Sequence, residues 1–216
     1  MSIKGIIFDF DGTLFDSMSI WETAGEDYLS SLGYAAEEDL GKKLRPMSLM
    51  QSAEYLKEHY AMPLSTAEII SGVNKTVEDF YLYRAMPKDN VIPVLSVLQN
   101  RGIKMCIATV TDHYQVEAAL KRCDMLGYFD FIFTCTEAGY GKDKPHIYEL
   151  ARKAMRTDRS ETAVFEDTYY AAKTAKNAGF FLVGVYDRYE KRTQELKLLA
   201  DVYVSSFWET DKLIYL

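Results

Sequence analysis

The segment IIFDFDGTLFDS, residues 6 to 17, places three acidic residues within eight positions, directly after a short apolar run. These residues are Asp9, Asp11 and Asp16. An apolar run of this length that ends in acidic residues and Gly12 is typical of a buried strand followed by a tight turn. Carboxylates this close repel one another, and a buried one is costly unless something compensates its charge. The segment therefore predicts a strand whose carboxyl end carries charges that need a partner.

Residues 17 to 88 carry apolar residues at helical spacing and contain no convincing strand. Three stretches each open with a serine, a residue that favours helix N-termini, and the first of them ends at Gly33. They are SMSIWETAGEDYLSSLG, SLMQSAEYLKEHY and STAEIISGVNKTVEDFYLYRAM. This pattern predicts an all-helical domain over residues 17–88, inserted into a domain formed by residues 1–16 and 89–216. We expect Asp16 and Ser17 to begin the first inserted helix.

Strands and helices alternate after the insert. The predicted strands are IKMCIAT, FDFIFTC, TAVFED, FFLVGVY and DVYVSS, with a helical pattern before each of them. Asp112 is the expected N-cap of the helix that follows the first of these strands. Alternation of this kind indicates βαβ units and a parallel sheet that is covered on both faces. The sequence therefore predicts an α/β fold: a doubly wound parallel sheet, interrupted after its first strand by an all-helical insert.

The composition of the 216 residues narrows the class of protein. With 48% hydrophobic and 26% charged residues the chain is that of a globular protein, and its net charge of −7 opposes nonspecific binding to nucleic acid or to an anionic membrane. No apolar run approaches membrane-spanning length, and the N-terminus turns acidic too early for a signal peptide. The three widely spaced cysteines indicate reduced, buried thiols. A cytoplasmic protein, monomeric by default, is the expectation.

Polar residues follow four of the predicted strands. In doubly wound sheets, ligands bind beyond the carboxyl ends of the strands, where the strand order reverses. Any one of these residues alone would fit a helix cap or a solvated loop, but together, at equivalent places in the topology, they indicate a site. Four neighbouring carboxylates need a divalent cation, and oxygen ligands at that density suit Mg²⁺. The residues are Asp9, Asp11, Thr109, Lys142, Glu166 and Asp167.

The same residues lie in four recognisable segments. The first, DFDGTLFDS at residues 9 to 17, matches D-x-D-G-T-[LV]-x-[DN]-[ST] at every position. The others are Thr109 at the end of KMCIAT, Lys142 in GKDKPHIY, and the segment VFEDTYYAAKTAKNAG. In this order, over residues 3 to 186, they resemble the four motifs of the haloacid dehalogenase-like superfamily. The insert resembles the helical cap of its phosphoglycolate phosphatase and β-phosphoglucomutase branch.

The resemblance implies roles for the two aspartates of the first motif. Asp9 would be the nucleophile that attacks phosphorus and forms an aspartyl-phosphate. Asp11 would protonate the leaving alkoxide and then activate the water that hydrolyses the intermediate. Mg²⁺ would be held by Asp9, the backbone carbonyl of Asp11 and Asp167, with Glu166 further from the metal or linked to it through water.

The resemblance also implies a phosphate-binding set. Thr109 would donate a hydrogen bond to a phosphoryl oxygen, and Lys142 would offset the negative charge of the nucleophile and the phosphate together. Gly12 would permit the tight turn and the close approach of the backbone to the phosphate. Lys144 is a rival for the role of Lys142, but its spacing to Pro145 does not match the motif.

Several positions depart from the family pattern. Val110 follows Thr109 where Asn or Ala is frequent, and Asp143 and His146 stand where Pro and Asp are usual. TYY at residues 168 to 170 replaces the usual S-x-x-G neighbourhood. Tyr169 or Tyr170 could pack as ordinary helix residues or line the mouth of the cleft, and we expect packing.

The chemistry within the superfamily is narrowed by two further comparisons. Dehalogenases and phosphonate hydrolases of this fold lack an acid at the position of Asp11, which argues against both. β-Phosphoglucomutases carry a histidine near the place of Trp21 and an arginine near that of Leu49, and this chain has neither. A mutase remains the alternative, because Arg45 with Lys42 and Lys43 could replace those cations. The candidate specificity residues in the insert are Trp21, Arg45 and Met47.

The resulting hypothesis is a Mg²⁺-dependent phosphatase that hydrolyses a small phosphorylated metabolite, such as a sugar phosphate or a phosphoglycolate-like compound. The insert would close over the site and supply specificity. A remote alternative is a phospho-accepting receiver domain, which also combines acids, a hydroxyl and a lysine on such a sheet. Receivers are near 120 residues long and carry no helical insert of this kind. The sequence does not identify the substrate.

Overall fold

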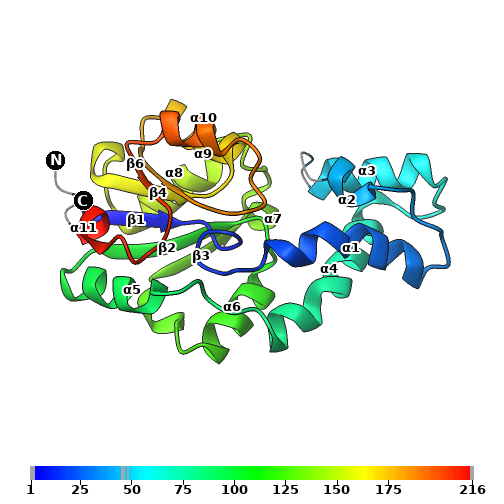
Figure 1. Cartoon of the computed structure of the whole chain (residues 1–216), viewed down its shortest axis with the longest axis horizontal. Coiled ribbons are helices and arrows are strands. Elements are labelled where there is room, and N and C mark those ends of the chain that lie inside the picture. The colour runs from blue at the N-terminus through cyan, green and yellow to red at the C-terminus, as the bar shows by residue number, and fades with distance from the viewer. Residues whose placement is uncertain (1–2, 45–46, 48, 215–216) are drawn as a thin grey trace. The chain divides into compact units, whose positions relative to one another are not determined.

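A computed structural model describes residues 3–44, 47 and 49–214. The chain forms two compact units (Figure 1): the larger contains Met1–Asp16 and Met86–Leu216, and the smaller contains Ser17–Ala85. Each unit has its own buried side chains and is described separately below.

The larger unit is built on a six-stranded sheet in the order β3-β2-β1-β4-β5-β6. All five strand pairs are parallel. The order reverses at β1, because β2 and β3 extend to one side and β4 to β6 to the other, which confirms the doubly wound α/β fold. The strands are β1 (Gly5–Phe8), β2 (Lys104–Thr109), β3 (Phe131–Thr134), β4 (Thr162–Glu166), β5 (Phe181–Val185) and β6 (Val202–Val204).

Helices connect the strands of this unit. Two of them, α7 and α11, are only four and five residues long, too short for helical periodicity to be visible in the sequence. Asp112 occupies the N-cap of α6, as predicted, without a side-chain capping hydrogen bond; its carboxylate accepts a hydrogen bond from the Thr136 hydroxyl. The helices are α5 (Val91–Asn100), α6 (His113–Arg122), α7 (Cys135–Ala138), α8 (His146–Met155), α9 (Tyr169–Asn177), α10 (Thr193–Leu199) and α11 (Thr210–Ile214), with 3₁₀ turns η1 (Leu126–Tyr128) and η2 (Arg159–Glu161).

Successive residues of the central strands pack on opposite faces of the sheet. Ile7 and Val164 join the cluster of buried side chains that α8 and α9 contribute. On the other face the ring of Phe8 packs against those of Phe165 and Phe129. Because β1 is buried on both faces, it reads as a continuous apolar run rather than an alternating one.

The chain leaves and re-enters the larger unit along two adjacent linkers. The Asp16 amide donates to the Met86 carbonyl (3.0 Å) and the Lys88 amide donates to the Leu14 carbonyl (2.8 Å). These bonds attach residues 86–88 to the larger unit. The sequence analysis places these three residues in the insert, because no apolar pattern marks the linker.

The smaller unit contains α1 (Met18–Ser31), α2 (Leu40–Leu44), α3 (Leu49–His59) and α4 (Thr66–Tyr83). Ser65 caps α4 through a reciprocal pair of hydrogen bonds with Glu68. Ser17 occupies the N-cap of α1 without a capping hydrogen bond from its side chain. Ser17 therefore begins α1 by position, as expected, whereas the Asp16 side chain pairs with Arg188 (3.4 Å).

Two further expectations concern the whole chain. Within residues 3–44, 47 and 49–214, no helix has both the length and the apolar character needed to cross a membrane. All three cysteines are free thiols; Cys106 and Cys135 are buried as expected, whereas Cys123 is only half-buried.

Candidate active site

The sheet itself brings the acidic residues together. β1 ends at Phe8, and the amide of the next residue, Asp9, still donates to the Phe165 carbonyl of β4 (2.9 Å). Glu166 is the last residue of β4 and Asp167 follows it. Parallel pairing of β1 with β4 therefore places these three acids at one edge, where the strand order reverses.

Lys142 is the cation at this edge. It lies in the loop between α7 and α8, and only 2% of its side chain is exposed. Its Nζ is 2.5 Å from Asp9 Oδ1 and 2.8 Å from Glu166 Oε2, so one ammonium group bridges two buried carboxylates. The rival lysine, Lys144, is exposed.

Glu166 is held by further donors. Its Oε2, besides facing Lys142, accepts from the Tyr148 hydroxyl (3.4 Å), and its Oε1 accepts from the hydroxyl (2.8 Å) and the amide (3.3 Å) of Thr168. Both carboxylate oxygens are therefore occupied by groups of the chain. This arrangement suits a residue that fixes the position of Lys142.

Burial and crowding dominate the electrostatics of the acids. Burial, with the nearby charge of Glu166, raises the pKa of Asp9 to about 8, against the opposing effect of Lys142. Burial and the charges of Glu166 and Asp9 likewise raise the pKa of Asp167 well above its ordinary range. Burial lowers the pKa of Lys142, but Asp9 and Glu166 outweigh this effect and raise it well above its usual value. Three buried carboxylates with one ammonium group are thus short of positive charge.

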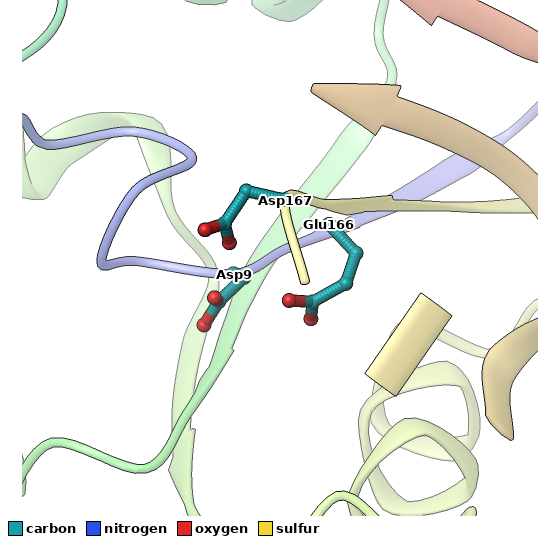
Figure 2. A group of neighbouring side chains, drawn as sticks. All are labelled: Asp9, Glu166 and Asp167. Carbon is teal, nitrogen blue, oxygen red and sulfur yellow. The ribbon is translucent and has the colours of Figure 1, made fainter. Parts of the chain in front are cut away.

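The donor set fits a hard divalent cation. One carboxylate oxygen from each of Asp9, Glu166 and Asp167 lies within 4.8 Å of the others, and Figure 2 shows the three side chains gathered at this edge of the sheet. An all-oxygen, multiply negative set is what Mg²⁺ prefers. The Asp11 carboxylate is not a member of this group.

Asp11 belongs to a second set of contacts with the end of β2. Its Oδ2 accepts from the Thr111 hydroxyl at 2.5 Å, and the Thr111 amide donates to the Thr109 hydroxyl at 3.1 Å. The three side chains are buried. The chain turns directly after Asp11, at Gly12. The φ of Gly12 is +72°, in the left-handed region that favours glycine.

The candidate specificity residues belong to the smaller unit. The Trp21 indole donates to the Tyr81 hydroxyl at 2.8 Å, a contact within the helical unit that occupies its only polar group. Met47 is half-buried beside α2, where its amide donates to the Leu44 carbonyl. Arg45 lies outside the described residues.

Several residues at the site were not anticipated from the sequence. Thr111 and Thr168 each follow a predicted site residue by one or two positions, so a search of the strand ends for hydroxyl groups would have found them. Thr13, whose hydroxyl donates to Asp167 Oδ1 (3.2 Å), lies within the first motif and was open to the same search. Tyr148 had no comparable signal, because it looks like any apolar position of α8.

The two tyrosines after Thr168 differ from each other. Tyr169 packs as expected: the Arg192 guanidinium lies 3.8 Å from the centre of its ring, and the ring contacts a buried cluster. Tyr170 is 49% exposed, so the expectation that it packs is wrong. Although about half of the residue is exposed, loss of water around its phenol group raises the pKa of that group; Lys142 opposes this effect and Glu166 adds to it.

The arrangement is suited to the chemistry of anions. The ammonium group of Lys142, together with a divalent cation held by the neighbouring carboxylates, would provide positive charge where a phosphoryl or carboxylate group binds. A doubly wound parallel sheet with acids and a lysine at its switch point defines a class of α/β enzymes in which the ligand binds at that edge.

The chain matches the haloacid dehalogenase-like hydrolase family over residues 3–179. It therefore belongs to that family and is a hydrolase by descent, as the sequence motifs indicated.

Individual relatives are distant but match along most of their length. The chain is 25% identical to the phosphorylated carbohydrates phosphatase of Thermotoga maritima, covering 82% of each chain. It is 23% identical to the β-phosphoglucomutase of Bacillus subtilis, covering 85% of this chain and 83% of the other. The crystal structure of CbbY from Rhodobacter sphaeroides in complex with phosphate is similar with a TM-score of 0.82 at 22% identity, covering 96% of both chains. At this level of identity the structural likeness establishes the fold.

Proposed function

We propose that the protein is a Mg²⁺-dependent phosphatase that hydrolyses a small phosphorylated metabolite through an aspartyl-phosphate on Asp9. The observation that carries the proposal is the buried ammonium group of Lys142, 2.5 Å from Asp9 Oδ1 and 2.8 Å from Glu166 Oε2. An ammonium group in this position lowers the repulsion between a carboxylate nucleophile and an anionic phosphate. Membership of a hydrolase family supports the reaction class.

In the first step a carboxylate oxygen of Asp9 attacks phosphorus, the bond from phosphorus to the substrate oxygen breaks, and Asp11 gives its proton to the departing alkoxide. In the second step Asp11 takes a proton from a water molecule, whose oxygen attacks phosphorus and releases inorganic phosphate with Asp9 restored. The Thr111 hydroxyl, 2.5 Å from Asp11 Oδ2, orients that carboxylate for both transfers.

Mg²⁺ would neutralise charge that develops on the transferring phosphoryl group. Asp9, Asp167 and the Asp11 backbone carbonyl would hold it, with Glu166 acting on Lys142 or through water. Thr109 and Lys142 would bind phosphoryl oxygens, and Gly12 would allow the backbone to approach them.

A small phosphorylated carbohydrate is the proposed substrate class, with no nucleic acid or membrane involved and a monomer as the default. Support comes from the Thermotoga maritima relative, which is named for phosphorylated carbohydrates. Trp21, Arg45 and Met47 of the smaller unit are proposed to contribute specificity.

The phosphomutase alternative is supported by the Bacillus subtilis relative. A mutase must also bind the second phosphate of a sugar bisphosphate. Two cations of the smaller unit that could do so are engaged locally: Lys42 with Asp39 (2.6 Å) and Lys43 with Glu37. These pairs are exposed and hold the lysines only weakly, so the phosphatase is favoured instead by Trp21 and Leu49, which stand where β-phosphoglucomutases carry a histidine and an arginine.

The test is hydrolysis of p-nitrophenyl phosphate and a panel of sugar phosphates by the full chain with Mg²⁺. We expect turnover that excess EDTA abolishes, and loss of at least about 10⁴-fold in kcat for Asp9→Asn. Asp89→Asn, an exposed aspartate of the larger unit, is the matched control and should retain full activity. Equal inactivity of wild type and Asp9→Asn across the panel would contradict the proposal.

Product analysis separates the two functions. Glucose 1-phosphate supplied with a glucose bisphosphate primer should release inorganic phosphate without accumulation of glucose 6-phosphate. Stoichiometric glucose 6-phosphate without phosphate release would establish the mutase instead.

A further inference from the structure

The loop that carries Lys142 runs from the end of α7 to the start of α8 and contains two glycines, Gly139 and Gly141. Gly139 ends α7 in the left-handed region, with a φ of +74°. Glycine loses more conformational freedom on folding than any other residue, so a loop with two glycines is costly to fix in one conformation. A lysine on such a loop keeps one position only if something else constrains the backbone around it.

Two aromatic rings supply a constraint of this kind. Tyr140 precedes Lys142 by two residues, and His146, the first residue of α8, follows it by four. The two rings are stacked, with their centroids 4.0 Å apart and an angle of 17° between their planes. Between them the Lys144 amide donates to the Gly141 carbonyl at 3.1 Å, which closes a turn that contains Lys142. The stack therefore joins the two ends of the segment that presents the lysine.

The stack and the lysine differ in their exposure. Tyr140 is 50% exposed and His146 is exposed, whereas the Lys142 side chain is buried with its Nζ 2.5 Å from Asp9 and 2.8 Å from Glu166. Because half of Tyr140 remains in contact with water, burial of apolar surface explains only part of what the stack contributes. A small displacement of the loop would lengthen both contacts of Lys142, and reaction rates respond steeply to misplacement of a group that binds the reacting atoms.

We propose that Tyr140 and His146 are positioning residues, whose stacked rings close the loop over residues 140–146 and hold the Lys142 ammonium group between Asp9 and Glu166. The inference rests on the proposed function, because it requires Lys142 to bind the phosphoryl group. Neither ring takes part in the reaction steps proposed above. His146 is also a position at which the third motif departs from the family pattern, so this constraint is a property of the present chain.

Tyr140→Ala and His146→Ala break the same stack. Each should lower kcat/KM for p-nitrophenyl phosphate about 3- to 10-fold and raise the inhibition constant of inorganic phosphate by a similar factor. The variant with both changes should lose no more than either single variant, because the stack is already broken in each of them. Tyr140→Phe keeps a ring that can stack and should stay within about twofold of wild type.

Phe131→Ala is the matched control. Phe131 is 42% exposed, its ring centroid lies 6.0 Å from that of Phe133, and it is the first residue of β3, whereas the site lies at the carboxyl ends of the strands. The control removes an exposed aromatic ring from a ring pair of the same unit, and it should change kcat/KM by less than about twofold. A lower Tm with unchanged kinetic constants in Tyr140→Ala and His146→Ala would indicate a merely structural stack and overturn the inference.

A second comparison tests whether the rings act through the lysine. When Lys142→Met is already present, Tyr140→Ala should lower kcat/KM by less than about twofold, measured at high enzyme concentration. A further loss of about 3- to 10-fold in that background would mean that the ring acts on the substrate itself, and it would overturn the inference. If Tyr140→Ala does not fold, His146→Ala decides by the same criteria.

Failure of the inference can be distinguished from failure of the proposed function. Turnover by the wild type that both alanine variants retain in full would overturn the inference alone. A wild type without turnover on the whole panel of phosphate esters would overturn the proposed function, and the inference with it.

Discussion

Two glutamates, one in each unit, form charge clusters with a lysine and a tyrosine. Glu166 of the larger unit faces Lys142 and Tyr148 and is fully buried. Glu37 of the smaller unit accepts from Lys43 and the Tyr55 hydroxyl, and its side chain is 23% exposed, while that of Lys43 is 49% exposed. The chemical groups are alike, and the surroundings differ.

The difference shows which cluster needs a functional explanation. Water already solvates the charges around Glu37, so their pairing contributes little and costs little. Around Glu166 the same groups have lost their water, and two further buried acids, Asp9 and Asp167, add repulsion. Burying the Glu166 cluster costs free energy of folding, and its charges lie where they could act on a ligand. Acids whose pKa values are strongly shifted are typically found at functional sites.

The largest effect should follow removal of the central cation. Lys142→Met leaves Asp9 and Glu166 buried with no ammonium group between them. We expect kcat/KM to fall at least about 1,000-fold and the free energy of unfolding without Mg²⁺ to fall by about 3–5 kcal/mol. Steady-state kinetics and urea denaturation measure the two effects.

Lys144→Met is the control for that variant, because it removes the exposed lysine two residues away. It should change neither quantity appreciably. A large loss of activity in Lys144→Met with little loss in Lys142→Met would reverse the assignment of the phosphate-binding lysine.

A smaller effect should follow the change that keeps the shape of Glu166 and removes its charge. In Glu166→Gln, Lys142 retains its partner Asp9, so we expect kcat to fall about 10- to 100-fold. If Glu166 acts by holding Lys142, the Mg²⁺ dissociation constant should change by less than about threefold, whereas Asp167→Asn should raise it more than tenfold. Equal losses of Mg²⁺ affinity in both variants would make Glu166 a direct metal ligand.

Much of this site could be predicted from the sequence, because its residues immediately follow apolar strands. Parallel strands end at a common edge, so Asp9 and Glu166 were expected at the same edge of the sheet once the alternation of strands and helices was recognised. That β1 and β4 are direct neighbours comes from the structure. Lys142 required the family motif, since a lysine in a loop carries no periodicity that distinguishes it from Lys144.

Other features could not be predicted in this way. The pairing of Lys88 with Asp187 depends on the register of a linker held by backbone bonds, and nothing in the local sequence encodes that register. Asp112 was predicted correctly as the N-cap residue of α6, but its carboxylate accepts a hydrogen bond from Thr136, a tertiary contact that the local sequence does not encode.

Binding of Mg²⁺ to the acids of the larger unit should raise the thermal stability of the protein. The Glu37 cluster should not bind the cation and should not contribute to this stabilisation. At a concentration about ten times its dissociation constant, we expect the wild-type Tm to rise by about 3–6 °C, since metal binding favours the folded state. Differential scanning fluorimetry with and without EDTA measures the shift. Asp167→Asn should lose the shift and Glu37→Gln should retain it; the reverse pattern would place the cation in the helical unit.

The smallest effect should come from the exposed cluster. Hydrogen bonds from Lys43 and then Tyr55 lower the pKa of Glu37 below its ordinary range. A carboxyl group whose pKa is lower in the folded state contributes stability above its unfolded-state pKa, and this contribution is lost as the pH falls through the folded-state pKa. Glu37→Gln should therefore lower Tm at pH 7 by at most about 3 °C, and the difference from wild type should close as the pH falls below about 4.

Glu54→Gln, an exposed glutamate of α3, controls for the loss of one negative charge and should leave Tm unchanged at both pH values. A Tm loss for Glu37→Gln as large as that for Lys142→Met, or one that persists unchanged at low pH, would remove the contrast between the two clusters. The Glu37 cluster would then be a structural centre of the helical unit, and burial alone would no longer separate functional charges from structural ones in this chain.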